Sequence, residues 1–461
     1  MRMGTMLGLR FVVYHTSKKK GESIMFKKVS TFFLGVVFFM AIGGISFASE
    51  SLSIFWAEWD PASYLQELVL DFEAETGIKV TVETTPWGDF QTKTFREFAA
   101  KGDSWDLVVG DSQWLGAGST QGHYVDLTDW FLKKGVDKTM APATIAGYAE
   151  YPGGSGKYWA VPLEGDAVGW SYRKDLFEDP KEKAAFYKKY GYELGIPKTW
   201  HMLKDIAEFF HRPDKGRYGA AIYTQKDYDA LTMGIENTLF SWGADLGDPK
   251  TYRVEGVLNS KVGIDSLEFY KELYKFTPPD WGNVFFQKNN QAMTEGIVAM
   301  SMNYFAFFPA LLNPAVNKYA KEMGFFSNPS GPYGHRFSAL GGQGISVISY
   351  SKKRDLAFKF LEWFIRDDVQ KRWAELGGYT CNANVLKSEK FLTDTPYNRA
   401  FYETMFMVKD FWAVPEYAEL LEVCQRNWHQ YVVEGKGTAK EAMDNIAKDW
   451  EVIFKKHGRL K

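Results

Sequence analysis

Apolar and polar residues in the first part of the chain follow a pattern that predicts strands separated by an amphipathic helix. Residues 52–56 and 78–82 form short runs typical of strands, and apolar residues recur at helical spacing between them. Asp60 can cap this helix at its start, and Gly77 can end it. The pattern therefore predicts a βαβ unit, which belongs in a sheet covered by helices.

The same alternation continues along the chain. A second unit is predicted from a helix over 89–100 and a strand over 105–109, and further short strands and helices follow. The C-terminal part is largely helical, because apolar residues share one face over 356–364 and again over 442–453. No internal repeat is present. We predict an α/β fold with a helical C-terminal region.

Composition excludes several classes of protein. With 45% hydrophobic residues, 24% charged residues and a net charge of -2, the chain is neither disordered nor a typical nucleic-acid binder. Its aromatic content is high, at 36 Phe, 25 Tyr and 16 Trp. These rings fit either a large core or a site lined for a ligand with apolar faces.

The N-terminal region carries the pattern of an export signal that begins at Met25. A basic start, an apolar run over 32–45 and a small-x-small cleavage site before residue 49 predict a signal peptide over 25–48. Residues 1–24 fit no part of that pattern, and we interpret them as a mis-assigned upstream extension. No Cys stands at the cleavage site, so no lipid anchor is expected, and the mature protein is predicted to be periplasmic.

Cysteine and histidine usage predicts no metal site and no cofactor. Cys381 and Cys424 form either a disulfide, which export permits, or two buried free thiols, and the sequence leaves both open. The seven His residues include no pair at helical ligand spacing.

Several stretches of the mature chain resemble, in the same order, the extracellular solute-binding proteins of family 1. These are the maltose-binding-protein-like carbohydrate receptors of ABC importers. The stretches are FEAETGIKVTV (72–82), WDLVVGDSQW (105–114), YWAVPL (158–163), YRKDLF (172–177), PKTW (197–200), AMSMN (299–303) and GGQGI (341–345).

The resemblance implies a two-lobed periplasmic binding protein of type II, with a hinge of about three chain crossings. Its first lobe is expected to contain 49–165 and 299–348, and its second lobe 166–298 and the helical 349–461. Such a protein captures a sugar in the cleft between the lobes and delivers it to the permease subunits of an ABC importer. A monomer that binds neither nucleic acid nor membrane is expected.

Sugar binding requires aromatic rings, which stack on the apolar faces of the ligand, and carboxylates or amides, which bond its hydroxyls. Loops at the C-terminal ends of strands are where an α/β sheet places such groups. From these loops and the resemblance, the candidate ligand-binding residues are Glu58, Trp59, Trp87, Asp111, Gln113, Trp114, Asp166, Trp170, Tyr223, Trp242, Asn303, Tyr304, Gly342 and Gln343.

A structural role is also open for several candidates. Asp111 can cap a helix, Trp87 can cover the edge of the sheet, Trp242 can belong to the core, and Gly342 can serve a turn that needs a positive φ. Candidates in the second lobe match the family least well.

Two alternative functions stay open. The first is a receptor of the same fold for a polyol, a polyamine or another small solute. The second is an exported glycoside hydrolase, in which two carboxylates such as Glu58 and Asp111 act as acid and base. No nucleophile motif accompanies these carboxylates, so we predict a binding protein and not an enzyme.

Overall fold

The computed structural model describes residues 50–461, apart from the side chains of Tyr228 and Asp229. The expected extension and signal peptide lie outside the described residues. The strands are β1 (Ser51–Ala57), β2 (Lys79–Thr85), β3 (Leu107–Asp111), β4 (Val161–Arg173), β5 (Tyr218–Ala221), β6 (Val298–Tyr304), β7 (Met323–Ser327), β8 (Ser338–Val347) and β9 (Val408–Lys409). The helices are α1 (Asp60–Thr76), α2 (Trp87–Ala100), α3 (Leu115–Thr120), α4 (Thr128–Lys133), α5 (Val136–Thr139), α6 (Pro142–Tyr148), α7 (Lys174–Glu178), α8 (Pro180–Tyr190), α9 (Trp200–Phe210), α10 (Met233–Ser241), α11 (Lys261–Tyr274), α12 (Phe286–Glu295), α13 (Phe308–Leu312), α14 (Arg354–Phe364), α15 (Asp367–Leu376), α16 (Ala383–Leu386), α17 (Glu389–Asp394), α18 (Asn398–Thr404), α19 (Tyr417–Val432) and α20 (Ala439–Lys456).

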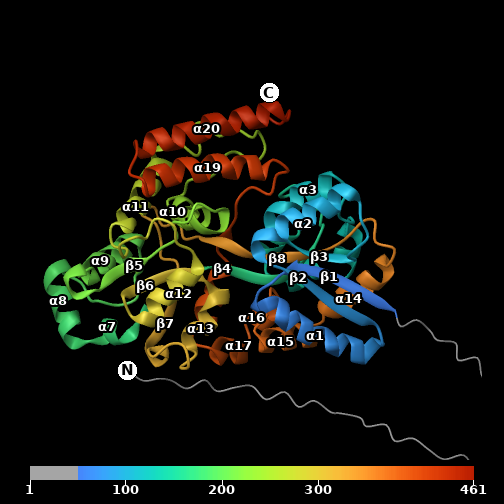
Figure 1. Cartoon of the computed structure of the whole chain (residues 1–461), viewed down its shortest axis with the longest axis horizontal. Helices are drawn as coiled ribbons and strands as arrows, with labels where there is room; N and C mark the ends of the chain where they lie inside the picture. Colours follow the sequence, from blue (N-terminus) through green and yellow to red (C-terminus); the bar gives the residue numbers. More distant parts are fainter. Residues whose placement is uncertain (1–49) are drawn as a thin grey trace, which may run out of the picture. The chain divides into compact units, whose positions relative to one another are not determined.

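The long strand β4 is shared by two groups of strands (Figure 1). Its first part, from Val161 to Ala167, pairs with β8, which pairs in turn with β3. Its second part, from Val168 to Arg173, pairs with β6 and β7. The strand order β2-β1-β3-β8-β4-β6-β5 therefore joins a first half, built on β1 to β3, to a second half, built on β5 to β7.

The βαβ units predicted from the sequence are confirmed. β1 is parallel to both β2 and β3, and α1 and α2 connect them. Gly77 ends α1 with φ 75°, as expected for a glycine after a helix. The prediction that Asp60 caps α1 is wrong: Trp59 holds the cap position, no side chain makes a capping bond, and Asp60 is the first helical residue. A carboxylate there still stabilises the helix through its dipole.

The contacts divide the chain differently from the expected lobe boundaries. α14 and α15 pack against α1: the rings of Phe360 and Phe72 lie 5.4 Å apart, and Trp363 Nε1 donates to Glu75 at 3.1 Å. β6 and β7 pair with the second part of β4. We therefore propose that 354–376 belong to the first half and that 298–327 belong to the second.

Four helices of the second half pack together. α19 and α20 pack against each other and against α11, which also contacts α10 (Figure 1). The chain passes between the halves in β4, in β8, and between α15 and α18, where α18 contacts β7.

Both cysteines are buried and free. Among residues 50–461, no helix combines the length and the apolar character needed to cross a membrane.

Candidate functional site

A cavity of about 330 Å³ lies where the C-terminal ends of β1, β2 and β3 meet β4, β6 and β8. Because β1, β2 and β3 are parallel, the residues that follow them reach the same edge of the sheet. Glu58 and Trp59 follow β1, Trp87 follows β2, and Asp111 and Gln113 stand at the end of β3, and all five line the cavity. The volume lies within the range of small-molecule sites.

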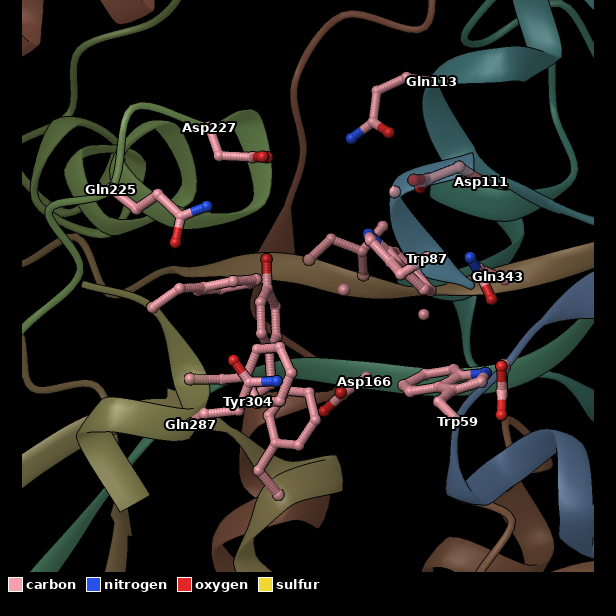
Figure 2. A pocket seen from close by; sticks show the side chains of 18 residues that line it. Trp59, Trp87, Asp111, Gln113, Asp166, Gln225, Asp227, Gln287, Tyr304 and Gln343 are labelled. Atoms are coloured by element: carbon pink, nitrogen blue, oxygen red, sulfur yellow. The ribbon is translucent and has the colours of Figure 1, made fainter. Parts of the chain in front are cut away.

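The opposite wall comes from the second half (Figure 2). Gln225 and Asp227 follow β5, residues 285–287 lie at the start of α12, and Phe307 lies after β6. Tyr304, the last residue of β6, also lines the cavity. Figure 2 shows Gln225 and Asp227 on the side facing Asp111 and Gln113. A ligand in the cavity would therefore touch both halves.

Aromatic rings form two platforms in the cavity wall. On the first half, the Trp59 ring packs edge-on against Trp56 and tilted against Trp87, with 5.6 Å between centroids in each pair. On the second half, Phe286 and Phe307 stack with centroids 4.0 Å apart and planes 9° from parallel. Such faces suit the apolar C–H surfaces of a flat or chair-shaped ligand.

Three buried polar atoms of lining residues have no hydrogen-bond partner in the described part of the chain: Trp59 Nε1, Gln113 Oε1 and Gln343 Nε2. The opposite ends of the two amides are fixed, because Gln113 Nε2 donates to Asp410 Oδ1 at 3.3 Å and Trp56 Nε1 donates to Gln343 Oε1. Buried polar atoms normally have partners. Residues of the cavity wall therefore hold one acceptor and two donors that the described residues leave unsatisfied.

Asp166 on β4 forms part of the cavity floor. Its Oδ1 accepts from Ala167 N–H at 2.8 Å and from Ala306 N–H at 3.3 Å, which ties the carboxylate to the turn after β6. Burial raises the pKa of Asp166 to about 8, although these N–H groups oppose the shift. Glu164 is fully buried on the same strand and outside the cavity lining, and both of its oxygens have no partner within residues 50–461.

Glu164→Gln is expected to gain stability relative to the wild type as the pH rises from 5 to 8. Burial, and then the charges of Asp166 and Asp111, raise the pKa of Glu164 well above its usual value. The folded protein thus keeps a proton that the unfolded chain loses above a pKa of about 4.3, so wild-type stability falls with rising pH through this window. The glutamine variant lacks this loss.

The measurement is urea unfolding at pH 5 and pH 8. The stability difference between variant and wild type is expected to grow by at least about 1 kcal/mol between these pH values. Asp166 and Asp111 also act on Glu164, but both are present in the variant and in the wild type, so the comparison isolates Glu164. Tyr148, Tyr379 and Cys381 lie near it as well and stay neutral in this range, because burial raises their pKa values. The exposed Glu193→Gln is the control and should show no such pH dependence. A constant difference for Glu164→Gln would contradict the prediction.

Three tryptophans proposed from the sequence do not line the cavity. Trp114 is buried on the 3-10 turn after β3, where it packs against two phenylalanines of α2. Trp170 lies inside β4 and donates to Asn328 at 2.8 Å. Trp242 follows α10 and packs against Phe269, with centroids 4.6 Å apart. All three belong to the core. For Trp242, the sequence had left this core position open as an alternative to ligand binding.

Tyr223 and Asn303 also lie behind the cavity wall and not in it. The Tyr223 hydroxyl donates to Asn303 Oδ1 at 2.6 Å and accepts from Tyr304 N–H at 3.0 Å. Both residues therefore position Tyr304, which does line the cavity. The remaining candidates, Glu58, Trp59, Trp87, Asp111, Gln113, Asp166, Gly342 and Gln343, all line it. Asp111 in addition accepts from Ser112 N–H at 2.9 Å, as a cap of the short turn.

Several lining residues were not anticipated from the sequence. These are Gly88, Gln225, Asp227, Phe285, Phe286, Gln287, Phe307 and Leu340. A signal existed for the second half: polar residues follow β5, and an aromatic-polar run follows the Pro278-Pro279 turn. Tertiary packing decides which residues of these two runs face the cavity. The local sequence pattern does not predict which ones do.

The two halves joined by shared strands, with a cavity lined from both, define a two-lobed periplasmic binding protein. Two solved structures share this fold: the maltose-bound MalE3 of T. maritima (TM-score 0.73, 21% identity, 87% of this chain and 99% of that one) and a ribitol complex of an ABC transporter solute-binding protein from Agrobacterium radiobacter (TM-score 0.72, 22% identity, 88% and 99%). The two-lobed fold predicted from the sequence is confirmed.

The chain belongs to the bacterial extracellular solute-binding protein family, whose model matches residues 56–371. Among curated relatives, the diacetylchitobiose-binding protein DasA of Streptomyces coelicolor is 25% identical over 366 residues, which cover 75% of this chain and 76% of that protein.

Proposed function

We propose that this chain is an exported periplasmic receptor that captures a carbohydrate or a polyol and delivers it to the permease subunits of an ABC importer. It acts as a monomer. The family and the named relatives are binding proteins of this kind, and the two structures described above hold maltose and ribitol. This supports a receptor over the alternative of a glycoside hydrolase.

One cavity combines aromatic rings with amide and carboxyl side chains, and this combination supports the proposal. The rings of Trp59 and of the stacked Phe286 and Phe307 offer apolar faces. Gln113 and Gln343 contribute amide side chains, and Glu58 and Asp111 contribute carboxyl groups, to the same walls. A polyhydroxylated ligand with apolar C–H faces satisfies both requirements at once.

A screen of mono-, di- and oligosaccharides and sugar alcohols tests this function. Because Trp59 and Trp87 line the cavity, the bound compound is expected to change the intrinsic fluorescence, and at about 100 times its Kd to stabilise the protein by about 2.7 kcal/mol. Fluorescence titration and thermal unfolding report the two effects. If no carbohydrate or polyol produces either effect, the proposed function is wrong.

A further inference from the structure

The stacked rings of Phe286 and Phe307 belong to two separate segments of the chain. Phe286 is the first residue of α12, whose start has no side-chain capping bond, and Phe307 ends the 3-10 turn Phe305–Phe307 that follows β6. α12 packs along β6 (Figure 1). Both rings line the cavity, yet neither lies in a strand, so strand pairing does not fix their positions.

Two asparagine side chains join these segments. Asn290 Nδ2 donates to the Phe307 carbonyl oxygen at 2.7 Å, and Asn303 Nδ2 donates to the Phe286 carbonyl oxygen at 3.1 Å. The two amides also bond each other, because Asn303 Nδ2 donates to Asn290 Oδ1 at 2.8 Å. The backbone of each stacked residue is therefore tied to the same pair of amides.

Asn290 is the member of this pair that has no place in the sheet. It lies one turn after Phe286 on the same face of α12, is half-buried, and stands outside the cavity lining. Asn303 lies in β6 and also accepts from the Tyr223 hydroxyl, which supports Tyr304. The amide of Asn290 thus connects the stacked pair to the network that holds the rest of this wall.

We propose that Asn290 is a positioning residue of the ligand site. It holds the stack of Phe286 and Phe307 in the orientation in which a ligand meets it, and it does not touch the ligand itself. Ring faces contribute most when they meet their partner at the right distance and angle, and a binding site depends on the side chains that lock such groups in place. This inference concerns the site of the proposed receptor and rests on that function.

Asn289, the neighbouring residue of α12, provides a matched control. Its Nδ2 donates to the Met302 carbonyl oxygen at 2.7 Å, inside β6, and neither residue lines the cavity. Asn289→Ala and Asn290→Ala each remove hydrogen bonds to the backbone, so urea unfolding should show a loss of stability in both. Only Asn290→Ala should also disturb the stacked rings.

Fluorine NMR tests the position of the rings without any added compound. With 4-fluorophenylalanine at position 307, the fluorine resonance depends on the ring current of Phe286, and Phe286→Leu gives the resonance of the unstacked ring. The resonance is expected to shift by more than its linewidth in Asn290→Ala and in Asn290→Asp, which keeps the shape of the side chain and loses the donor. It should stay in place in Asn289→Ala. An unchanged resonance in both Asn290 variants would overturn the inference.

Isothermal titration calorimetry gives the second test. The probes are glucose, galactose, mannose, maltose, cellobiose, chitobiose, ribitol, mannitol and sorbitol. For a compound that binds the wild type, Asn290→Ala is expected to weaken binding about tenfold and Asn289→Ala less than about twofold. In a Phe307→Ala background, Asn290→Ala should change the affinity less than about twofold, because Asn290 acts through this ring. A full tenfold loss in that background would contradict the inference.

The outcomes separate the inference from the proposed function. If Asn290→Ala and Asn289→Ala change the affinity equally, the inference is wrong and the receptor function stands. If none of these compounds binds the wild type, the proposed function is contradicted, and the fluorine spectra alone decide whether Asn290 positions the stacked rings.

Discussion

Gly342→Ala is expected to lower the free energy of unfolding by at least about 3 kcal/mol, since it combines backbone strain with a clash. Gly342 lies in β8 with φ 84°, where any residue with a Cβ is strained. The added Cβ would stand 2.4 Å from the Glu164 carbonyl oxygen and 2.6 Å from the Asp166 nitrogen, and these atoms belong to the paired strand β4. Neither strand can move aside without breaking the pairing that joins the two halves.

Gly334→Ala is the matched control. Gly334 has φ 85°, but nothing lies within 4 Å of its added Cβ, so this variant carries only the backbone strain and should lose about 1 kcal/mol. Urea unfolding of both variants without ligand gives the comparison. If the two losses are equal, the contact between β8 and β4 is looser than the structure indicates.

Trp59→Ala is expected to weaken binding of the ligand found in the carbohydrate screen about 30-fold, or about 2 kcal/mol. Trp59 is half-buried and packs between the buried Trp56 and the exposed Trp87. It lines the cavity, and its Nε1 has no partner in the described part of the chain. Trp59→Phe keeps a ring and loses the donor, so it should fall between the wild type and the alanine variant. Isothermal titration calorimetry measures the three affinities.

Trp242→Ala serves as the comparison for a tryptophan outside the cavity. Its ring packs against Trp200 and Phe269, and its removal should cost about 3 kcal/mol of stability while leaving the affinity within about twofold. Trp242→Phe is the milder variant if the alanine protein does not fold. A loss of affinity in Trp242→Phe similar to that of Trp59→Ala would place Trp242 in the site after all.

The first half of the fold could be predicted from the sequence because its signals are local. Each strand from β1 to β3 is a short run followed by a helix start, and the C-terminal ends of parallel strands meet. Glu58, Trp59 and Asp111 were therefore anticipated at the cavity. The division into lobes that we propose could not be predicted in this way, because it rests on the packing of α14 on α1, a contact between segments far apart in the chain.

The candidates that lie outside the cavity have a similar explanation. Gln113 and Trp114 are neighbours on one short turn, yet the first lines the cavity and the second packs into the core. Tyr223 and Gln225 follow the same strand. Gln225 lines the cavity, whereas Tyr223, which has a ring suited to stacking, lies behind the wall and supports Tyr304. Residue type favoured both members of the first pair and only the tyrosine of the second, whereas the direction of each side chain is set by tertiary packing.

The stacked pair of Phe286 and Phe307 has a consequence for how such a receptor can diversify. The two rings stack on each other within the protein, so this wall loses little freedom on binding. Gln225, which is half-buried, and Gln287, which is exposed, line the cavity beside it, and neither belongs to the hydrophobic core. Mutations at these two positions can exchange one pattern of hydroxyl recognition for another at little cost in stability, so new specificities are open to selection while the aromatic wall is retained.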